Sequence, residues 1–113
     1  MIRIMKENEY CWGIYDCCYR NSKKMLTAID IDTFGIKTTI YDLNDIIKIE
    51  KQVKDLTSDE IYKFFIAAYG NDLNYIEICE DRIVVNIFDY GEKTYIEYFY
   101  DDYVDITDMI KRA

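Results

Sequence analysis

Acidic and aromatic side chains alternate through residues 75–103, and these are the residues whose types and spacing could do chemistry. Tyrosine gives a large contact area and a hydroxyl at low cost in conformational entropy, and interleaved carboxylates select for Lys and Arg on a partner. This pattern predicts a contact surface for another protein. The candidate partner-binding residues are Glu77, Tyr95, Glu97, Phe99, Asp101, Asp102 and Tyr103.

The same residues are also compatible with two different roles. Aromatic and charged pairs across neighbouring strands stabilise a sheet without any partner. A second copy of the chain could also cover this face, which would make the protein a homodimer. Both alternatives stay open from the sequence alone.

The sequence contains no histidine, which removes the Ser/His/Asp triad and the imidazole that usually activates a cysteine nucleophile. Paired carboxylates occur throughout so acidic a chain, so they specify no general acid and base. The Gly-x-Lys-Thr sequences at Gly35 and Gly91 lack the spacing of a phosphate-binding loop. We expect no catalytic residue and no cofactor, and the chain is not predicted to be an enzyme.

Metal binding is also disfavoured. The four cysteines show no C-x-x-C spacing, which argues against a zinc site, and we expect them to be reduced thiols. Several aspartates near the C-terminus could hold Mg²⁺ or Ca²⁺, but EF-hand spacing is absent and helix N-termini favour aspartate in any case. The residues concerned are Cys11, Cys17, Cys18 and Cys79, and Asp30, Asp32, Asp101, Asp102, Asp105 and Asp108.

The net charge of −8 is unevenly distributed along the 113 residues. Residues 1–56 contain nine basic and nine acidic side chains, whereas residues 57–113 contain five basic and thirteen acidic ones. Direct binding to nucleic acid needs a basic surface, so the acidic half favours a basic protein as partner. The alternative is that these are ordinary charges that keep a small domain soluble.

Length and hydropathy predict a single domain covering residues 1–113, and half of the residues are hydrophobic, which argues against disorder. No run of about 18 apolar residues is present, so we expect no membrane association through a spanning helix. The first residues lack the apolar core of a signal peptide. The expected location is the cytoplasm, or the host cytoplasm if the chain is encoded by a phage.

Two segments resemble each other. Residues 34–40 and 90–96 both read aromatic-Gly-x-Lys-Thr-x-Ile, and residues 42–48 match residues 105–111 less closely. The matches predict a duplicated unit, a β-hairpin followed by a short helix, over about 25–48 and 82–111. The alternative is a chance match in a chain rich in Ile, Asp and Lys.

The best-defined element is a helix over residues 57–69. Thr57 and Glu60 form a capping-box pattern, and an apolar stripe containing Phe64 and Phe65 follows it. Strands are predicted over residues 1–5, 25–32, 37–41, 75–79, 82–88 and 93–100, and residues 9–19 favour a strand over a helix. A short helix or an irregular connection is expected over residues 43–54, and a last short helix is expected after Asp105 or Thr107.

Alternation assigns two faces to the strands of residues 75–100. Isoleucines, Val85 and Tyr98 share the inner face, and four of the partner-binding candidates, Glu77, Tyr95, Glu97 and Phe99, lie on the other face, with Asp101, Asp102 and Tyr103 expected to extend the same patch. The predicted inner face is Ile76, Ile78, Ile83, Val85, Ile87, Ile96 and Tyr98, and the predicted outer face is Tyr75, Glu77, Arg82, Val84, Asn86, Phe88, Tyr95, Glu97 and Phe99. In the first hairpin, Ile29, Ile31 and Ile40 are expected to meet on one face.

The sequence therefore predicts an α+β fold: one or two antiparallel sheets built from a duplicated hairpin-plus-short-helix unit, with one central amphipathic helix. The expected function is an acidic protein-binding module that inhibits a nuclease or other nucleic-acid-binding protein by occluding its basic surface. Small phage-encoded inhibitors of host defence, such as anti-CRISPR proteins, have this general composition, and the analogy is one of composition only. The alternatives are a toxin-neutralising immunity protein and a homo-oligomer that sequesters a small ligand.

Overall fold

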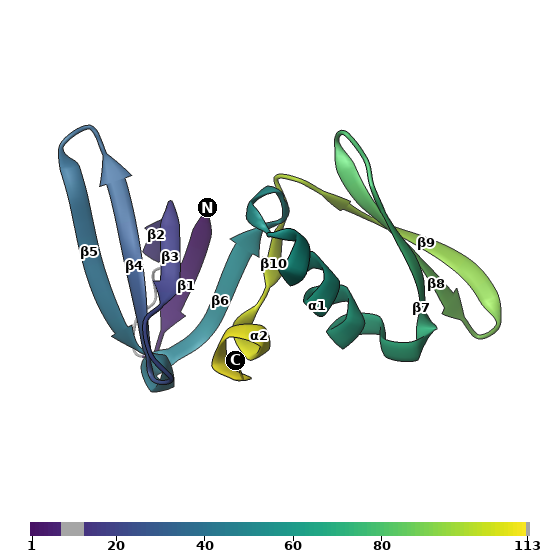
Figure 1. Cartoon of the computed structure of the whole chain (residues 1–113), viewed down its shortest axis with the longest axis horizontal. Coiled ribbons are helices and arrows are strands. Elements are labelled where there is room, and N and C mark those ends of the chain that lie inside the picture. Colours follow the sequence, from purple (N-terminus) through teal and green to yellow (C-terminus); the bar gives the residue numbers. More distant parts are fainter. Residues whose placement is uncertain (8–12, 113) are drawn as a thin grey trace. The chain divides into compact units, whose positions relative to one another are not determined.

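A computed structural model describes residues 1–7 and 13–112 and shows a small α+β fold with three antiparallel sheets and one main helix. The chain forms two compact units (Figure 1). The first unit contains residues 1–51 and 104–113, and the second contains residues 52–103. No helix in the described part of the chain is long and apolar enough to cross a membrane.

The first unit is built from two sheets. One has the order β10-β6-β1-β2, formed by Tyr103–Asp105, Ile46–Gln52, Ile2–Lys6 and Gly13–Tyr15. The other has the order β3-β4-β5, formed by Cys17–Arg20, Met25–Asp32 and Gly35–Asp42. The strand predicted over residues 9–19 is confirmed only in part: residues 13–19 form two short strands, β2 and β3, in different sheets, and residues 9–12 lie outside the described part. The buried core is Ile2, Ile4, Leu26, Ala28, Tyr41, Leu43, Ile46, Ile49, Val104 and Ile106.

The segment after the first hairpin departs from the predicted short helix. A 3₁₀ turn, Leu43–Asp45, leads directly into strand β6. Ile46 and Ile49 are both buried although they are three residues apart, a spacing typical of a helix. A register shift opposite Met5 and Lys6 leaves Ile47 as an extra, exposed residue in β6. Because of this extra residue, Ile46 and Ile49 point to the same, buried face of the strand.

The predicted duplication is not confirmed. The first hairpin is followed by a strand, whereas the second is followed by β10 and helix α2, Thr107–Arg112. The aligned glycines also occupy different positions. Gly35 pairs with Asp32 as the first residue of β5, whereas Gly91 lies inside a turn with Tyr90. Tyr90 and Gly91 both have positive φ, 49° and 82°, as a type I′ hairpin turn requires.

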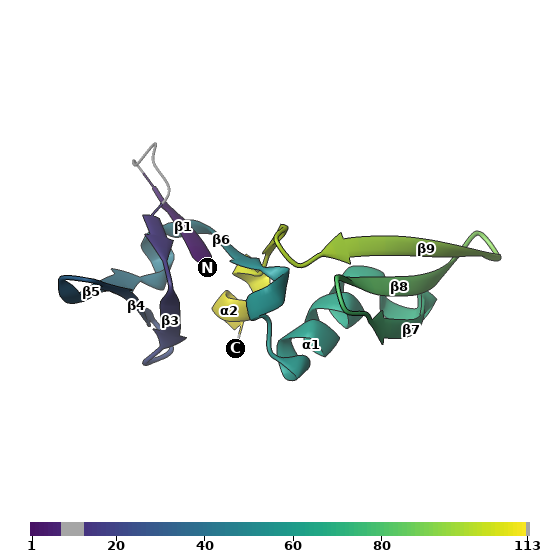
Figure 2. The ribbon, with the colours of Figure 1, turned by 90° about the horizontal axis from the view of Figure 1, so that it is seen from above.

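In the second unit, helix α1, Ser58–Tyr69, covers one face of the sheet β7-β8-β9 (Figure 2). The strands are Leu73–Ile78, Arg82–Asp89 and Glu92–Phe99, and 3₁₀ turns at Val53–Asp55 and Gly70–Asp72 flank the helix. The predicted helix and its capping box are confirmed: the N–H of Thr57 donates to Glu60 Oε1 at 2.9 Å, and the N–H of Glu60 donates to Thr57 Oγ1 at 3.2 Å.

The helix packs on the inner face of the sheet through aromatic rings. Phe65 is 1% exposed, and its ring centroid lies 4.9 Å from that of Tyr98 in an edge-to-face arrangement. Ile83, Val85 and Ile87 are buried on the same face of the sheet. Because the sheet has only one helix, its opposite face carries no covering element of the second unit.

Candidate partner-binding surface

The strand register fixes which side chains share the uncovered face. Tyr75, Asn86 and Tyr95 form one row across the three strands, and Glu77, Val84 and Glu97 form the next. The predicted division of the strands into two faces is therefore confirmed by the register, although Asn86 on the predicted outer face is buried and Ile78 on the predicted inner face is 62% exposed. The face, called the open face below, consists of Tyr75, Glu77, Arg82, Val84, Asn86, Phe88, Lys93, Tyr95, Glu97 and Phe99.

Four aromatic side chains give the open face its contact area. Tyr75, Phe88, Tyr95 and Phe99 are between 40% and 59% exposed, well above what a packed interior allows. The hydroxyl of Tyr75 donates to that of Tyr95 at 3.5 Å, and this hydrogen bond raises the pKa of Tyr75. Rings held in place by a sheet lose little entropy when a partner packs against them.

Asn86 lies between the two tyrosines in the register and is completely buried. Its Oδ1 accepts a hydrogen bond of 2.7 Å from Asn74 Nδ2, whereas its Nδ2 has no hydrogen-bond partner among the described residues. A buried amide group without a hydrogen-bond partner costs stability.

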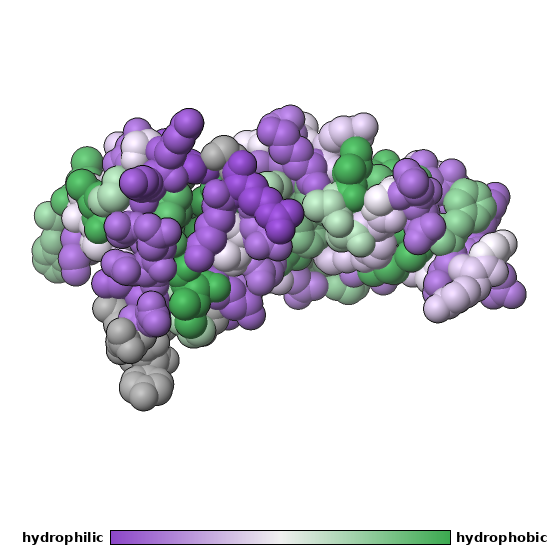
Figure 3. Space-filling model, turned by 90° about the horizontal axis from the view of Figure 1, so that it is seen from below, coloured by the Kyte–Doolittle hydropathy of each residue, from purple (hydrophilic) through white to green (hydrophobic). Residues whose placement is uncertain are grey.

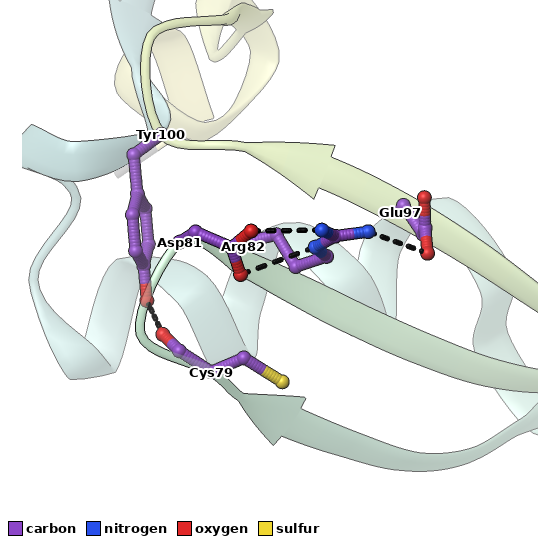
Figure 4. Close-up of polar contacts among 5 residues, drawn as sticks. All are labelled: Cys79, Asp81, Arg82, Glu97 and Tyr100. Carbon is purple, nitrogen blue, oxygen red and sulfur yellow. Dashed lines mark hydrogen bonds and ion pairs between the residues drawn. The ribbon is translucent and has the colours of Figure 1, made fainter.

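A charged cluster lies at the end of the open face, where β8 begins (Figure 4). The guanidinium of Arg82 contacts Asp81 Oδ2 at 2.7 Å and Glu97 Oε1 at 3.0 Å, and it lies 4.9 Å from the centroid of the Phe99 ring. The hydrogen bond from Arg82 lowers the pKa of Asp81, and the hydrogen bonds that Arg82 donates to Asp81 and Glu97 raise its own pKa. The three charges leave the cluster with a net charge of −1.

Backbone contacts hold this end of the sheet in place. The hydroxyl of Tyr100 donates to the carbonyl oxygen of Cys79, and the N–H of Cys79 donates to the carbonyl oxygen of Arg82 at 2.8 Å (Figure 4). The connection between β7 and β8 is thereby anchored on both sides. Arg82 therefore starts its strand from a fixed position, which keeps its guanidinium between the two carboxylates.

The structure separates the seven predicted site residues into two groups. Glu77, Tyr95, Glu97 and Phe99 lie on the open face. Asp101 and Asp102 instead lie in the turn after β9, and Tyr103 begins β10 in another sheet. In this turn, both aspartates make contacts with residues of the same unit.

Asp102 Oδ2 accepts from the N–H of Phe99 at 3.3 Å, and the carboxylate of Asp101 lies 3.4 Å from Lys54 Nζ. Asp101 and Asp102 are exposed, but Asp102 helps to form the turn that ends β9. The open face and its charged cluster also contain residues that were not among the seven predicted ones: Tyr75, Asp81, Arg82, Val84, Asn86, Phe88 and Lys93. The alternation placed Arg82 on the correct face, but only the register brings it beside Glu97.

Within the described residues, no group of three or more His, Cys, Asp or Glu side chains is arranged to hold a metal ion, and Cys17, Cys18 and Cys79 are free thiols. Comparisons with models of protein families, with curated proteins and with solved structures found no match to this chain. Its own residues therefore carry the functional assignment.

Proposed function

We propose that the protein is a small acidic protein-binding module whose open face docks on a basic surface of a partner protein. The observation that carries the proposal is a sheet face with four partly exposed aromatic rings, which no element of its unit covers, in a unit with a net charge of −8. On the face itself Arg82 and Lys93 balance Glu77 and Glu97, so the negative charge comes from the rest of the unit. Aromatic side chains are enriched at the centre of interfaces, and carboxylates select a cationic partner.

The distribution of charge supports the same partner class. The second unit contains four Lys and Arg side chains against twelve Asp and Glu, a net charge of −8, whereas the first unit contains ten of each. The whole excess of negative charge therefore lies in the unit that carries the open face. Such a field accelerates association with a cationic surface and makes it sensitive to salt.

The partner that fits best is a nuclease or another nucleic-acid-binding protein, and the protein would act as its inhibitor. Carboxylates of the second unit would lie where phosphates of the nucleic acid bind, and the aromatic rings would add contact area that a phosphate backbone lacks. A toxin neutralised by an immunity protein is a partner with the same surface chemistry.

The test compares two substitutions that change the net charge equally. Glu77→Lys alters the open face, whereas Asp72→Lys alters the 3₁₀ turn before β7. The tagged protein is first used to capture partners at low and moderate salt, with elution by nucleic acid. Affinity for the purified partner is then measured for both variants.

We expect Glu77→Lys to weaken binding at least about tenfold. Asp72→Lys should weaken it only about two- to threefold, because it reduces the net negative charge of the unit without changing the contact surface. Equal weakening by the two variants would show that the open face is not the contact surface. Failure of nucleic acid to compete with the captured partner would exclude occlusion of a nucleic-acid-binding site.

A second candidate function is favoured by a hollow beside helix α1. The hollow has a volume of about 500 Å³ and is lined by aromatic, aliphatic and amide side chains, including Tyr62, Ile66, Asn71, Asn74 and Tyr75. Pockets of this size bind small molecules, and the acidic unit would disfavour phosphorylated ones. An uncharged aromatic metabolite that raises the unfolding temperature, and does so less in Tyr62→Ala, would support this function.

A further inference from the structure

One face of the sheet β3-β4-β5 is apolar, and most of its side chains are exposed, although Thr27 in its middle is buried. The register places Ile29 opposite Cys17 and Thr38, places Thr27 opposite Tyr19 and Ile40, and pairs Ile31 with Ile36. The predicted meeting of Ile29, Ile31 and Ile40 on one face is confirmed, but this face is not the core: Leu26 and Ala28 are buried on the opposite face of β4. The isoleucine face is defined as Cys17, Tyr19, Thr27, Ile29, Ile31, Ile36, Thr38 and Ile40.

The exposed area of this face is large for an unpartnered surface. Ile31, Ile36 and Ile40 are 56%, 71% and 59% exposed, and Tyr19 is 51% exposed. Hydrophobic side chains are visible on the β4–β5 hairpin at the left of Figure 3. Single exposed isoleucines are normal on a protein surface, but a contiguous group on one flat sheet face marks an interaction site.

The eight residues of the isoleucine face are uncharged, and Asp42, which pairs with Met25 on the same side of the sheet, adds one charge at its base. This charge pattern favours an uncharged occupant. The charged pair of the hairpin, Asp30 and Lys37, lies on the opposite face. At the base, Asp42 is engaged by its own turn, where Oδ1 accepts from the N–H of Asn44 at 2.9 Å. A charged partner would gain nothing here, whereas a second copy would bring an equally neutral face from a unit that contains ten basic and ten acidic residues.

We propose that the isoleucine face is a homodimer interface, packed against the same face of a second copy. Two sheet faces pack about 10 Å apart with their side chains interdigitated, and a twofold axis makes such a contact self-complementary. From the exposed fractions, the face offers roughly 500 Å² per copy, and about 700 Å² with the fully exposed Phe34 at the hairpin tip. Two copies then bury about 1,000–1,400 Å², which reaches the lower range of specific interfaces.

The test is the mass of the protein in solution as a function of concentration, measured by sedimentation equilibrium. The test variant is Ile36→Lys, because a side chain that is 71% exposed contributes little to the core of its own chain. The matched control is Ile14→Lys in β2, where the isoleucine is 52% exposed on a different sheet of the same unit. Far-UV circular dichroism and the unfolding temperature check that both variants fold, and Ile31→Lys is the second variant.

We expect the wild-type protein to dimerise, Ile36→Lys and Ile31→Lys to raise the dimer dissociation constant at least tenfold, and Ile14→Lys to leave it within about twofold. The thiol of Cys17, which lies on the isoleucine face and is exposed in the single chain, gives a second measurement. Its alkylation should slow as the protein concentration rises in the wild type and in Ile14→Lys, but not in Ile36→Lys or Ile31→Lys.

Three outcomes would overturn the proposal. The first is a monomer at all concentrations up to about 1 mM. The second is a dimer that Ile36→Lys leaves intact, which would place the contact on another surface. The third is alkylation of Cys17 that is equally slow at every protein concentration, which would show that the face is covered within its own chain. None of these outcomes depends on the open face, so the proposed function is tested separately.

Discussion

Tyr95 and Tyr98 lie three residues apart on β9 and point to opposite faces of the sheet β7-β8-β9. The same substitution at both positions therefore tests which face of this sheet is covered by helix α1 and which is the open face. Tyr98 packs edge-to-face on Phe64 and Phe65, with ring centroids 6.4 Å and 4.9 Å apart, and its hydroxyl bonds that of Tyr69. Tyr95 is 59% exposed, and its hydroxyl accepts a hydrogen bond from that of Tyr75 at 3.5 Å.

The expected loss in the free energy of unfolding differs severalfold between the two sites. Tyr98→Ala removes a partly buried ring and two aromatic pairs worth about 0.5–1.5 kcal/mol each, so we expect a loss of about 3 kcal/mol. Tyr95→Ala removes an exposed ring from a strand, so we expect a loss below about 1 kcal/mol. Tyr98→Phe keeps the ring, loses the hydroxyl contact with Tyr69, and should cost about 1 kcal/mol.

The assay is urea denaturation followed by far-UV circular dichroism at one low protein concentration, so that self-association does not contribute. Because the chain has two units, the transition altered by Tyr98→Phe identifies the unfolding of the second unit. A loss for Tyr95→Ala equal to or larger than that for Tyr98→Ala would refute the assignment of faces, and with it the open face as a contact surface.

Three further predictions follow from local contacts. Thr57→Ala removes the capping box of α1 and should lower the free energy of unfolding by about 1 kcal/mol, whereas Ser58→Ala should change it little. The hydrogen bond from Arg82 lowers the pKa of Asp81 in the folded protein, so this pairing stabilises the fold above the ordinary aspartate pKa of about 3.9 and the stabilisation is lost as the pH falls below it. Between about pH 5 and pH 3, the unfolding temperature of Asp81→Asn should therefore fall less steeply than that of the wild type. Burial raises the pKa of the Cys18 thiol to about 12, so mass spectrometry should find its alkylation at pH 8 at least about 100-fold slower than that of exposed Cys17 in dilute protein, and equal rates would contradict this burial.

The elements that the sequence predicted correctly are those with complete local signals. The helix begins where Thr57 and Glu60 form a capping box and ends at Gly70, which has a positive φ of 55°. Both hairpins have a glycine at the turn and alternating apolar residues on either side. Alternation alone was enough to divide the strands of residues 75–100 into two faces, because each of them pairs antiparallel over most of its length.

The parts that were missed depend on contacts between distant segments. Ile46, Ile47 and Ile49 have helical spacing, and only the register shift opposite Met5 and Lys6 makes that spacing compatible with a strand. The charged cluster depends on β8–β9 pairing, which sets Arg82 opposite Phe99 and diagonal to Glu97. An explicit register for this hairpin, counted outward from the turn at Tyr90 and Gly91, would have found it.

The two proposed contacts respond in opposite directions to salt, and this separates them in a single experiment. The second unit contains twelve acidic and four basic side chains, and docking of the open face depends on the attraction of this net negative charge for a basic partner. Added salt screens the attraction and weakens binding. The isoleucine face has no charge to screen, and added sulfate strengthens apolar association. If sodium sulfate weakens partner binding while it strengthens the homodimer, the two surfaces act independently. If partner binding and dimerisation strengthen together, the partner binds through the isoleucine face or requires the dimer, and charge attraction is not what selects it.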